Sequence, residues 1–288
     1  MTPRTKTLAA VAAALALAVA GCGSDDDEDG SDNGAGASTE QAEPSRLAIE
    51  LSGSAKKPTF TVPDSIEGGV VEIEFTSSVP GEHSAQLVRA EDGHTTAEAL
   101  AAGQAWGESG KPLPDWAILA GGTGDVPRGG AVTVTQELTP GSYVVTDLSS
   151  NASAEFEVTG NAGAGELAAE GGTITATEYE FQSDGLTAGS APVLFDNAGQ
   201  EPHFVAAVGL RDGATIDDAR RFFETEKGKP PLDESRGFGT ALVEGGVKQS
   251  VELDLEPGRY VLLCFIPDRA GGPPHVAKGM ISEAEVAE

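Results

Sequence analysis

PGRYVLLCFIPDRAGGPPHVAKGM, residues 257–280, is the stretch of this chain that decides its fold. Its opening Pro-Gly pair predicts a turn. The apolar run 260–266 that follows is typical of a strand buried on both faces. Glycines and prolines then interrupt the run, so we expect a loop that folds back on the end of the strand. The stretch therefore predicts a β-sheet protein with this strand in its interior.

The composition agrees with a fold built mainly from strands. Aromatic residues make up only 5% of the 288 residues, whereas 38 glycines and 17 prolines favour short strands joined by many turns. Alternating apolar and polar residues at 173–181 and 247–255 predict two further strands. We expect one helix at 95–102 and another at 215–226, where Thr215, Asp217 and Asp218 suit a helix N-terminus.

An internal repeat relates the two parts of the chain. GVVEIEF at 69–75 aligns with GSAPVLF at 189–195, and the same offset of 120 residues places His83 on His203. At an offset of 117, LTPGSYV at 138–144 aligns with LEPGRYV at 255–261. Two copies of one domain explain this most simply, the first at 46–159 and the second at 166–288, with a Gly/Ala-rich joint at 160–165. We expect each copy to be a β-sandwich with one short inserted helix.

The N-terminus has the pattern of a targeting segment. Arg4 and Lys6 precede an apolar run at 8–20 that is too short to span a membrane comfortably, so 1–21 is predicted to be a signal peptide. Val-Ala-Gly-Cys at 19–22 resembles a bacterial lipobox, which implies cleavage before Cys22 and lipidation of its sulfur. Acyl chains would then hold the protein at the extracytoplasmic face of the bacterial cell membrane. An ordinary secretory signal with an incidental Cys22 is the alternative.

The segment 22–45 is predicted to be an acidic, disordered tether. It has no apolar periodicity and carries five consecutive acids at 25–29, so it cannot bury enough surface to offset its ordering entropy. The whole chain has a formal net charge of −28, which argues against binding to nucleic acid. The same charge suits solubility outside the cell, and it could attract a basic redox partner such as a cytochrome.

Cys22 and Cys264 are the only cysteines in the chain. If Cys22 carries lipid, Cys264 has no intramolecular partner, and an unpaired thiol in an exported protein risks oxidation unless something occupies it. A metal ion would occupy it. The alternative is a buried thiol that behaves as a small hydrophobic residue.

Three further side chains accompany Cys264 in an order that suits a metal ion. His275 and Met280 follow it in the same stretch, and His203 lies about sixty residues upstream. Two imidazoles, a thiolate and a weak thioether suit a copper ion that cycles between its cupric and cuprous states. Each residue alone has an ordinary interpretation, as a strand-end histidine, a core methionine or an inert thiol. The complete set of four predicts one type 1 copper site.

The second copy resembles the cupredoxins, the family of plastocyanin-like Greek-key sandwiches, over residues 171–286. The resemblance lies in EYEF at 178–181, in FDNAG at 195–199 before His203, and in GRY at 258–260 before Cys264. The spacing of His275 and Met280 is similar to that in plastocyanins, and HVAKGM at 275–280 resembles a stretch of the copper nitrite reductases. The resemblance implies an all-β protein of two tandem cupredoxin-like Greek-key β-sandwiches, and electron transfer through one blue-copper ion. The ten residues between Cys264 and His275 form a longer loop than in plastocyanins.

The first copy lacks this ligand set. It keeps His83, but Asp147 stands where Cys264 stands in the second copy, and no histidine and methionine follow Ser149 at the required spacing. We therefore expect it to bind no copper and to serve as a spacer or docking domain. Its two tryptophans, Trp106 and Trp116, are expected to be packing residues.

The histidine content argues against an enzyme. Multicopper oxidases and nitrite reductases need several further histidines, and Leu263 stands before Cys264 where nitrite reductases have a copper-binding histidine. The histidines of this chain are His83, His94, His203 and His275. The sequence therefore predicts an electron carrier that is not an enzyme. The alternative is a non-redox cupredoxin-like module for binding, copper storage or scaffolding.

Overall fold

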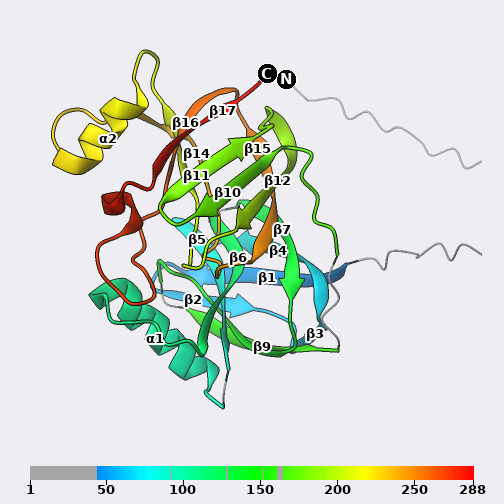
Figure 1. Cartoon of the computed structure of the whole chain (residues 1–288). Helices are drawn as coiled ribbons and strands as arrows, with labels where there is room; N and C mark the ends of the chain where they lie inside the picture. The colour runs from blue at the N-terminus through cyan, green and yellow to red at the C-terminus, as the bar shows by residue number, and fades with distance from the viewer. Residues whose placement is uncertain (1–43, 92, 128, 151, 161–164) are drawn as a thin grey trace, which may run out of the picture. The chain divides into compact units, whose positions relative to one another are not determined.

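The computed structural model describes residues 44–288 except 92, 128, 151 and 161–164 (Figure 1). The predicted signal peptide, the predicted lipidation site Cys22 and the predicted tether up to residue 43 lie outside the described residues. The described residues form one compact unit. Among the helices of the described residues, none has the length and apolar content needed to cross a membrane.

The first half of this unit runs from residue 44 to 160. Its elements in chain order are β1 (Ser45–Ser54), β2 (Lys57–Thr61), β3 (Ser65–Glu67), β4 (Gly69–Ser77), β5 (Glu82–Ala90), α1 (Thr96–Ser109), β6 (Ala117–Pro127), β7 (Ala131–Leu138), β8 (Gly141–Thr146) and β9 (Ser153–Thr159).

The second half runs from residue 165 to 288. Its elements are β10 (Thr173–Thr177), β11 (Glu180–Asp184), β12 (Gly189–Asn197), β13 (Ala206–Leu210), α2 (Ile216–Thr225), β14 (Leu232–Gly239), β15 (Lys248–Leu255), β16 (Gly258–Leu263), the 3-10 helix η1 (His275–Lys278) and β17 (Ile281–Val286). The described chain is therefore mainly β with one α-helix in each half, which confirms the predicted fold class.

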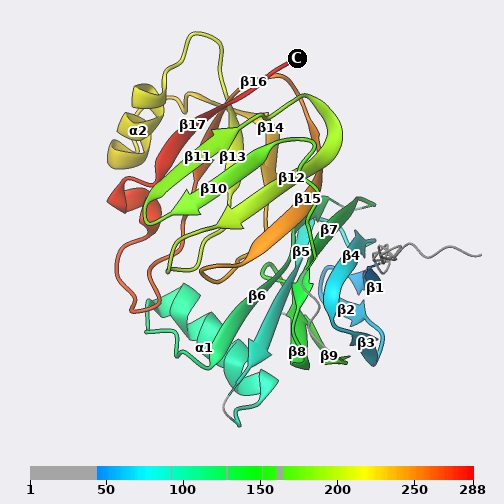
Figure 2. The same cartoon turned by 45° about the vertical axis from the view of Figure 1, so that its right-hand side comes forward.

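The strands form three sheets, and the largest contains strands of both halves. Its order is β11-β10-β12-β15-β7-β4-β1-β2, and the halves meet where β15 pairs with β7, with Gln249 opposite Gln136 (Figures 1 and 2). The first half adds the sheet β3-β9-β8-β5-β6, and the second adds the sheet β14-β13-β16-β17. Each half is a sandwich, and the two sandwiches share one continuous layer.

Apart from β3, the strands of the two halves have the same order in their sheets, and their central pairs have the same register. In the first half β5 pairs with β8 so that Gln86 faces Thr146, and in the second β13 pairs with β16 so that Ala206 faces Leu263. These two pairs are related by the offsets of 120 and 117 residues that the sequence shows. The domain boundary at 160–165 stays a prediction, because the halves share a sheet and 161–164 lie outside the described residues.

Each half encloses a hydrophobic core between its part of the large sheet and its smaller sheet. Phe75 and Tyr143 belong to the first core, and Phe195 and Tyr260 belong to the second. The apolar run predicted at 260–266 forms β16 up to Leu263, and its side chains are buried from Tyr260 onward. A strand with neighbours on both sides, here β13 and β17, explains the continuous apolar run.

Both helices are capped by the threonine that opens their predicted range. The side chain of Thr95 accepts a hydrogen bond from the backbone N–H of Glu98, and Thr215 does the same with Asp218. Helix α1 is longer than predicted and ends at Ser109. Burial of Trp106 on the first half explains the extra turns, because this packing outweighs the low helix propensity of the glycines in α1.

The strand predicted at 173–181 is a hairpin of β10 and β11. The chain turns at Tyr179, whose φ of 65° lies in the left-handed region that a bulky residue rarely adopts. This turn places the ring of Tyr179 beside the predicted ligand His275.

Candidate metal centre

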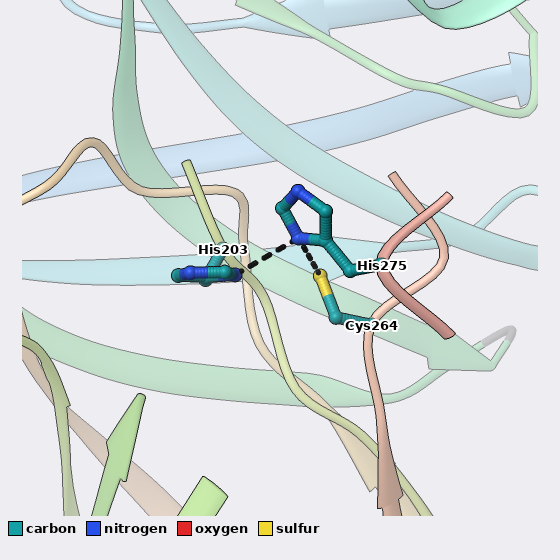
Figure 3. Close-up of side chains that lie close together, drawn as sticks. All are labelled: His203, Cys264 and His275. Atoms are coloured by element: carbon teal, nitrogen blue, oxygen red, sulfur yellow. Dashed lines mark hydrogen bonds between the residues drawn. The ribbon is translucent and has the colours of Figure 1, made fainter. Parts of the chain in front are cut away.

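Three of the four predicted ligands come from different parts of the second half and meet at one point. His203 precedes β13 and exchanges backbone hydrogen bonds with Val243, Cys264 directly follows β16, and His275 begins η1. Figure 3 shows His275 joined by dashed contacts to both other side chains. Each of the three is 0% exposed. The structure thus brings together His203, Cys264 and His275 as the sequence predicts.

The distances between the donor atoms are short. Nδ1 of His275 lies 3.1 Å from Nδ1 of His203 and 3.5 Å from Sγ of Cys264. A tetrahedral ion bonded to nitrogen at about 2.0 Å and to sulfur at about 2.3 Å separates two nitrogens by about 3.3 Å, and nitrogen from sulfur by about 3.5 Å. The donor atoms are therefore spaced as ligands of a single metal ion. One thiolate with two imidazoles fits copper.

Met280 lies at the end of the same segment. Its backbone N–H donates to the carbonyl of His275 over 3.0 Å, and its side chain is buried in the hydrophobic cluster that contains Cys264. Its role as an axial ligand stays a prediction.

Backbone hydrogen bonds hold both ends of the ligand loop, which we define as residues 265–274. The N–H of His275 donates to the carbonyl of Ile266 over 2.8 Å, and the N–H of Val276 donates to the carbonyl of Cys264 over 2.8 Å. The loop thereby closes on itself, and this closure places the imidazole of His275 beside the sulfur.

Burial controls the protonation of the donor atoms. It raises the pKa of the Cys264 thiol to about 11, because a thiolate is poorly solvated there. Burial, together with the neighbouring His275, lowers the pKa of His203 to about 4. Near neutral pH the metal-free site therefore holds a thiol and a neutral His203 imidazole. A metal ion must displace the thiol proton to bind the sulfur.

Asp268 in the ligand loop orients His275. Its Oδ1 lies 3.0 Å from Nε2 of His275 and accepts from the hydroxyl of Tyr179 over 3.1 Å, while Lys278 donates to Oδ2. Burial alone would raise the pKa of Asp268, but the hydrogen bonds from Lys278 and Tyr179 outweigh it and lower the pKa. An ionised Asp268 can only accept a hydrogen bond here, so Nε2 of His275 keeps its proton and donates it to Oδ1. The other ring nitrogen, Nδ1, is then unprotonated and free to bind a metal ion.

Sequence reasoning missed Asp268 and Tyr179. Asp268 is the one acidic residue in the ligand loop, and that is the signal that could have found it. The ring of Tyr179 meets the ring of His275 edge-on with 5.4 Å between centroids, and Nζ of Lys278 lies 4.6 Å from the centre of the Tyr179 ring. Tyr179 belongs to the EYEF motif at 178–181, but no local pattern marks it as a neighbour of the site, because its position follows from the turn between β10 and β11.

The comparisons with known proteins find similarity among solved structures. No family model matches the chain. No curated protein matches it. Reduced auracyanin from the photosynthetic bacterium Roseiflexus castenholzii is 20% identical over 40% of this chain and 95% of that chain, with a TM-score of 0.27.

Copper nitrite reductases are also among the similar structures. The Cu-containing nitrite reductase from Thermus scotoductus is 13% identical over 84% of this chain and 61% of that chain, with a TM-score of 0.22. The copper nitrite reductase from Nitrosomonas europaea is 11% identical over 84% of this chain and 94% of that chain, with a TM-score of 0.23. At TM-scores this low, the fold and the site rest on the strands and donor atoms described above.

Proposed function

We propose that this protein is an electron carrier with one type 1 copper ion, anchored by lipid to the extracytoplasmic face of the cell membrane. The convergence of two imidazole nitrogens and one sulfur at a fully buried point carries the proposal. A bound copper ion would supply a one-electron couple between its cupric and cuprous states.

The surroundings of the site favour a carrier over an enzyme. His203, Cys264 and His275 are all fully buried, so a substrate has no direct access to the donor atoms. Across the described part of the chain, no second group of three or more His, Cys, Asp or Glu residues converges in this way. The remaining histidines have other partners, because His83 pairs with Asp147 and His94 stacks on Trp116.

The chain's own residues hold the donors in place without a metal ion. His203 is tied to Val243 by two backbone hydrogen bonds of 3.0 and 2.9 Å, and Cys264 directly follows the interior strand β16. Ligands held by backbone hydrogen bonds beside packed strands shift little when the oxidation state changes, which keeps the reorganisation energy of electron transfer small.

The surface near the site suits contact with a redox protein. Phe265 follows the ligand Cys264 and is 44% exposed, and Pro273 beside the end of the ligand loop is also exposed. These exposed apolar side chains could contact a partner protein. The net charge of −28 supports a basic partner such as a cytochrome. The lipobox ending at Cys22 supports the membrane anchor.

Loading with Cu(II) tests the redox function. The purified mature protein should develop an intense blue absorption from thiolate-to-copper charge transfer, and Cys264→Ala should abolish it. Colourless protein that still binds copper would favour copper storage, and colourless protein without copper would favour a scaffold.

The membrane anchor is tested separately. Mass spectrometry of the protein extracted from membranes should find a diacylglyceryl group on Cys22, and Cys22→Ala should release the protein from the membrane fraction. An unmodified Cys22 in the mature chain would refute the lipid anchor.

A further inference from the structure

We infer that the first half acts as a clamp that fixes the ligand loop of the second half, and that Asp268 is the positioning residue through which the clamp reaches His275. The inference rests on the proposed function because it concerns the same site. It also gives the half without the ligand set a specific role.

Two successive carbonyls of the ligand loop bind donors of the first half. The indole Nε1–H of Trp106 donates to the carbonyl of Asp268 over 2.7 Å, and the backbone N–H of Leu113 donates to the carbonyl of Arg269 over 2.7 Å. The ligand loop lies beside α1 in both Figure 1 and Figure 2. Trp106 is therefore more than the packing residue that the sequence predicts.

The side chain of Arg269 adds a second attachment. Its Nη2 donates to the carbonyls of Pro114 and Ala117 over 2.6 and 3.0 Å. Its Nη1 pairs with Oε1 of Glu244 at 2.6 Å, and the same Glu244 oxygen accepts from the backbone N–H of Leu119 over 2.8 Å. A guanidinium that is mostly buried and satisfied by fixed backbone carbonyls has little freedom to move.

Close backbone packing makes the third contact. Gly110 caps the C-terminus of α1, and a Cβ added to Gly271 would lie 2.4 Å from the carbonyl oxygen of Gly110. Real Cβ contacts do not occur at such a distance, so the ligand loop can approach α1 only with glycine at this position.

These contacts converge on the ligand through one residue. The carbonyl of Asp268 binds Trp106 of the first half, while its carboxylate lies 3.0 Å from Nε2 of His275. A loop of ten residues with two glycines would sample many conformations by itself, so external contacts are needed to hold one geometry. The first half supplies these contacts, and Asp268 transmits them to the imidazole.

Two neighbouring glycines provide a matched test. Gly271 and Gly272 both have positive φ angles, of 85° and 112°, so alanine strains the backbone at either position. A Cβ at Gly272 meets no atom within 4 Å, whereas one at Gly271 meets Gly110. In the metal-free full-length protein, Gly271→Ala should speed hydrogen exchange of the His275 amide about tenfold relative to Gly272→Ala.

A second pair of variants removes one hydrogen bond and keeps the aromatic ring. Trp106→Phe should likewise speed exchange of the His275 amide by about three- to tenfold. Trp116→Phe, whose wild-type ring stacks on His94, should leave this exchange unchanged. In copper-loaded protein, Trp106→Phe should alter the copper hyperfine splitting in electron paramagnetic resonance, whereas Trp116→Phe should keep the wild-type splitting. Gly271→Ala should change the splitting more than Gly272→Ala.

The outcomes separate this inference from the proposed function. Equal exchange rates in both pairs of folded variants would overturn the clamp even if the protein is blue. Faster exchange only in Gly271→Ala and Trp106→Phe would support the clamp even if the protein takes up no copper. If either of these variants fails to fold, as judged by circular dichroism, the other pair decides.

Discussion

Nδ1 of His83 lies 2.8 Å from Oδ2 of Asp147, at the position in the first half that corresponds to His203 and Cys264 in the second. Both residues are buried, with His83 only 5% exposed and Asp147 0% exposed. Nε2 of His83 lies 3.2 Å from the carbonyl of Pro80, so both ring nitrogens face acceptors. The arrangement favours a protonated His83 ring. The first half therefore has a hydrogen-bonded His83–Asp147 pair at the position where the second half has its metal donors.

The pKa shifts agree with this ion pair. Burial would lower the pKa of His83, but its hydrogen bonds to Asp147 and Pro80 outweigh burial and raise the pKa. Burial would raise the pKa of Asp147, but hydrogen bonds from Ser150, His83 and backbone N–H groups outweigh it and lower the pKa. Each shift favours the charged form of its group.

Asp147→Asn should destabilise the protein by about 3 kcal/mol at pH 6, because it leaves a buried imidazolium without its counter-ion. Because folding raises the pKa of His83, the protonated His83 stabilises the fold fully at pH values below 6.5, its ordinary pKa. This contribution is lost as pH rises through the pKa of His83 in the folded protein. Because folding lowers the pKa of Asp147, the ionised Asp147 stabilises the fold at pH values above 3.8, its ordinary pKa. This contribution is lost as pH falls through the pKa of Asp147 in the folded protein. Urea unfolding should find the largest difference in the free energy of unfolding between Asp147→Asn and wild type at pH values between 3.8 and 6.5. A difference that stays constant from pH 5 to pH 9 would refute the ion pair.

Copper(II) binding at pH 7 should release about one proton, and the apparent affinity should rise about tenfold per pH unit near neutrality. The proton comes from Cys264, whose pKa of about 11 keeps the thiol protonated, while His203, with a pKa of about 4, is already neutral. Anaerobic calorimetry in buffers with different ionisation enthalpies measures the number of protons. An affinity independent of pH would show that the sulfur is not a ligand.

Asp268→Asn should raise the copper reduction potential. The substitution should destabilise the cupric state relative to the cuprous state by roughly 1 kcal/mol. The substitution removes a negative charge that favours the cupric state and leaves the Lys278 ammonium without its partner. Lys278→Met should shift the potential in the opposite direction. Spectroelectrochemistry measures both shifts, and Asp115→Asn is the control, because Asp115 is fully exposed near the same ligand loop. Shifts of the same sign in Asp268→Asn and Lys278→Met would contradict this electrostatic account.

Gln249→Ala should destabilise the protein by about 2 kcal/mol and make the two halves unfold at separate midpoints. The Gln249 side chain is 0% exposed, and its Nε2 donates to Oε1 of Gln136 over 2.5 Å and to the carbonyl of Gly122 over 3.0 Å, across the junction of the halves. Both tryptophans lie in the first half, so their fluorescence reports on that half while circular dichroism reports on both. Gln182→Ala on the exposed face of β11 is the control. Coincident transitions in Gln249→Ala would show that these bonds do not couple the halves.

Local patterns along the chain determined much of the fold. An apolar run after a Pro-Gly turn predicts β16, and threonine followed three residues later by an acid predicts the N-terminus of α2. The order of His203, Cys264 and His275 was likewise sufficient to predict the cluster, because strand ends in a sandwich meet at one edge. The strand and the helix start depend on neighbours in the sequence, and the cluster depends on the sandwich that the strand patterns predict, so the sequence alone reveals all three.

Contacts between distant residues were decided only by the tertiary structure. The pairing of β15 with β7 joins the halves into one sheet, and the bond from Trp106 to Asp268 joins residues that are 162 positions apart. Neither changes the local periodicity, since an alternating strand reads the same whether its neighbour belongs to its own half or to the other. The sequence thus determined which residues could form the metal centre, and long-range packing decided what holds them in position.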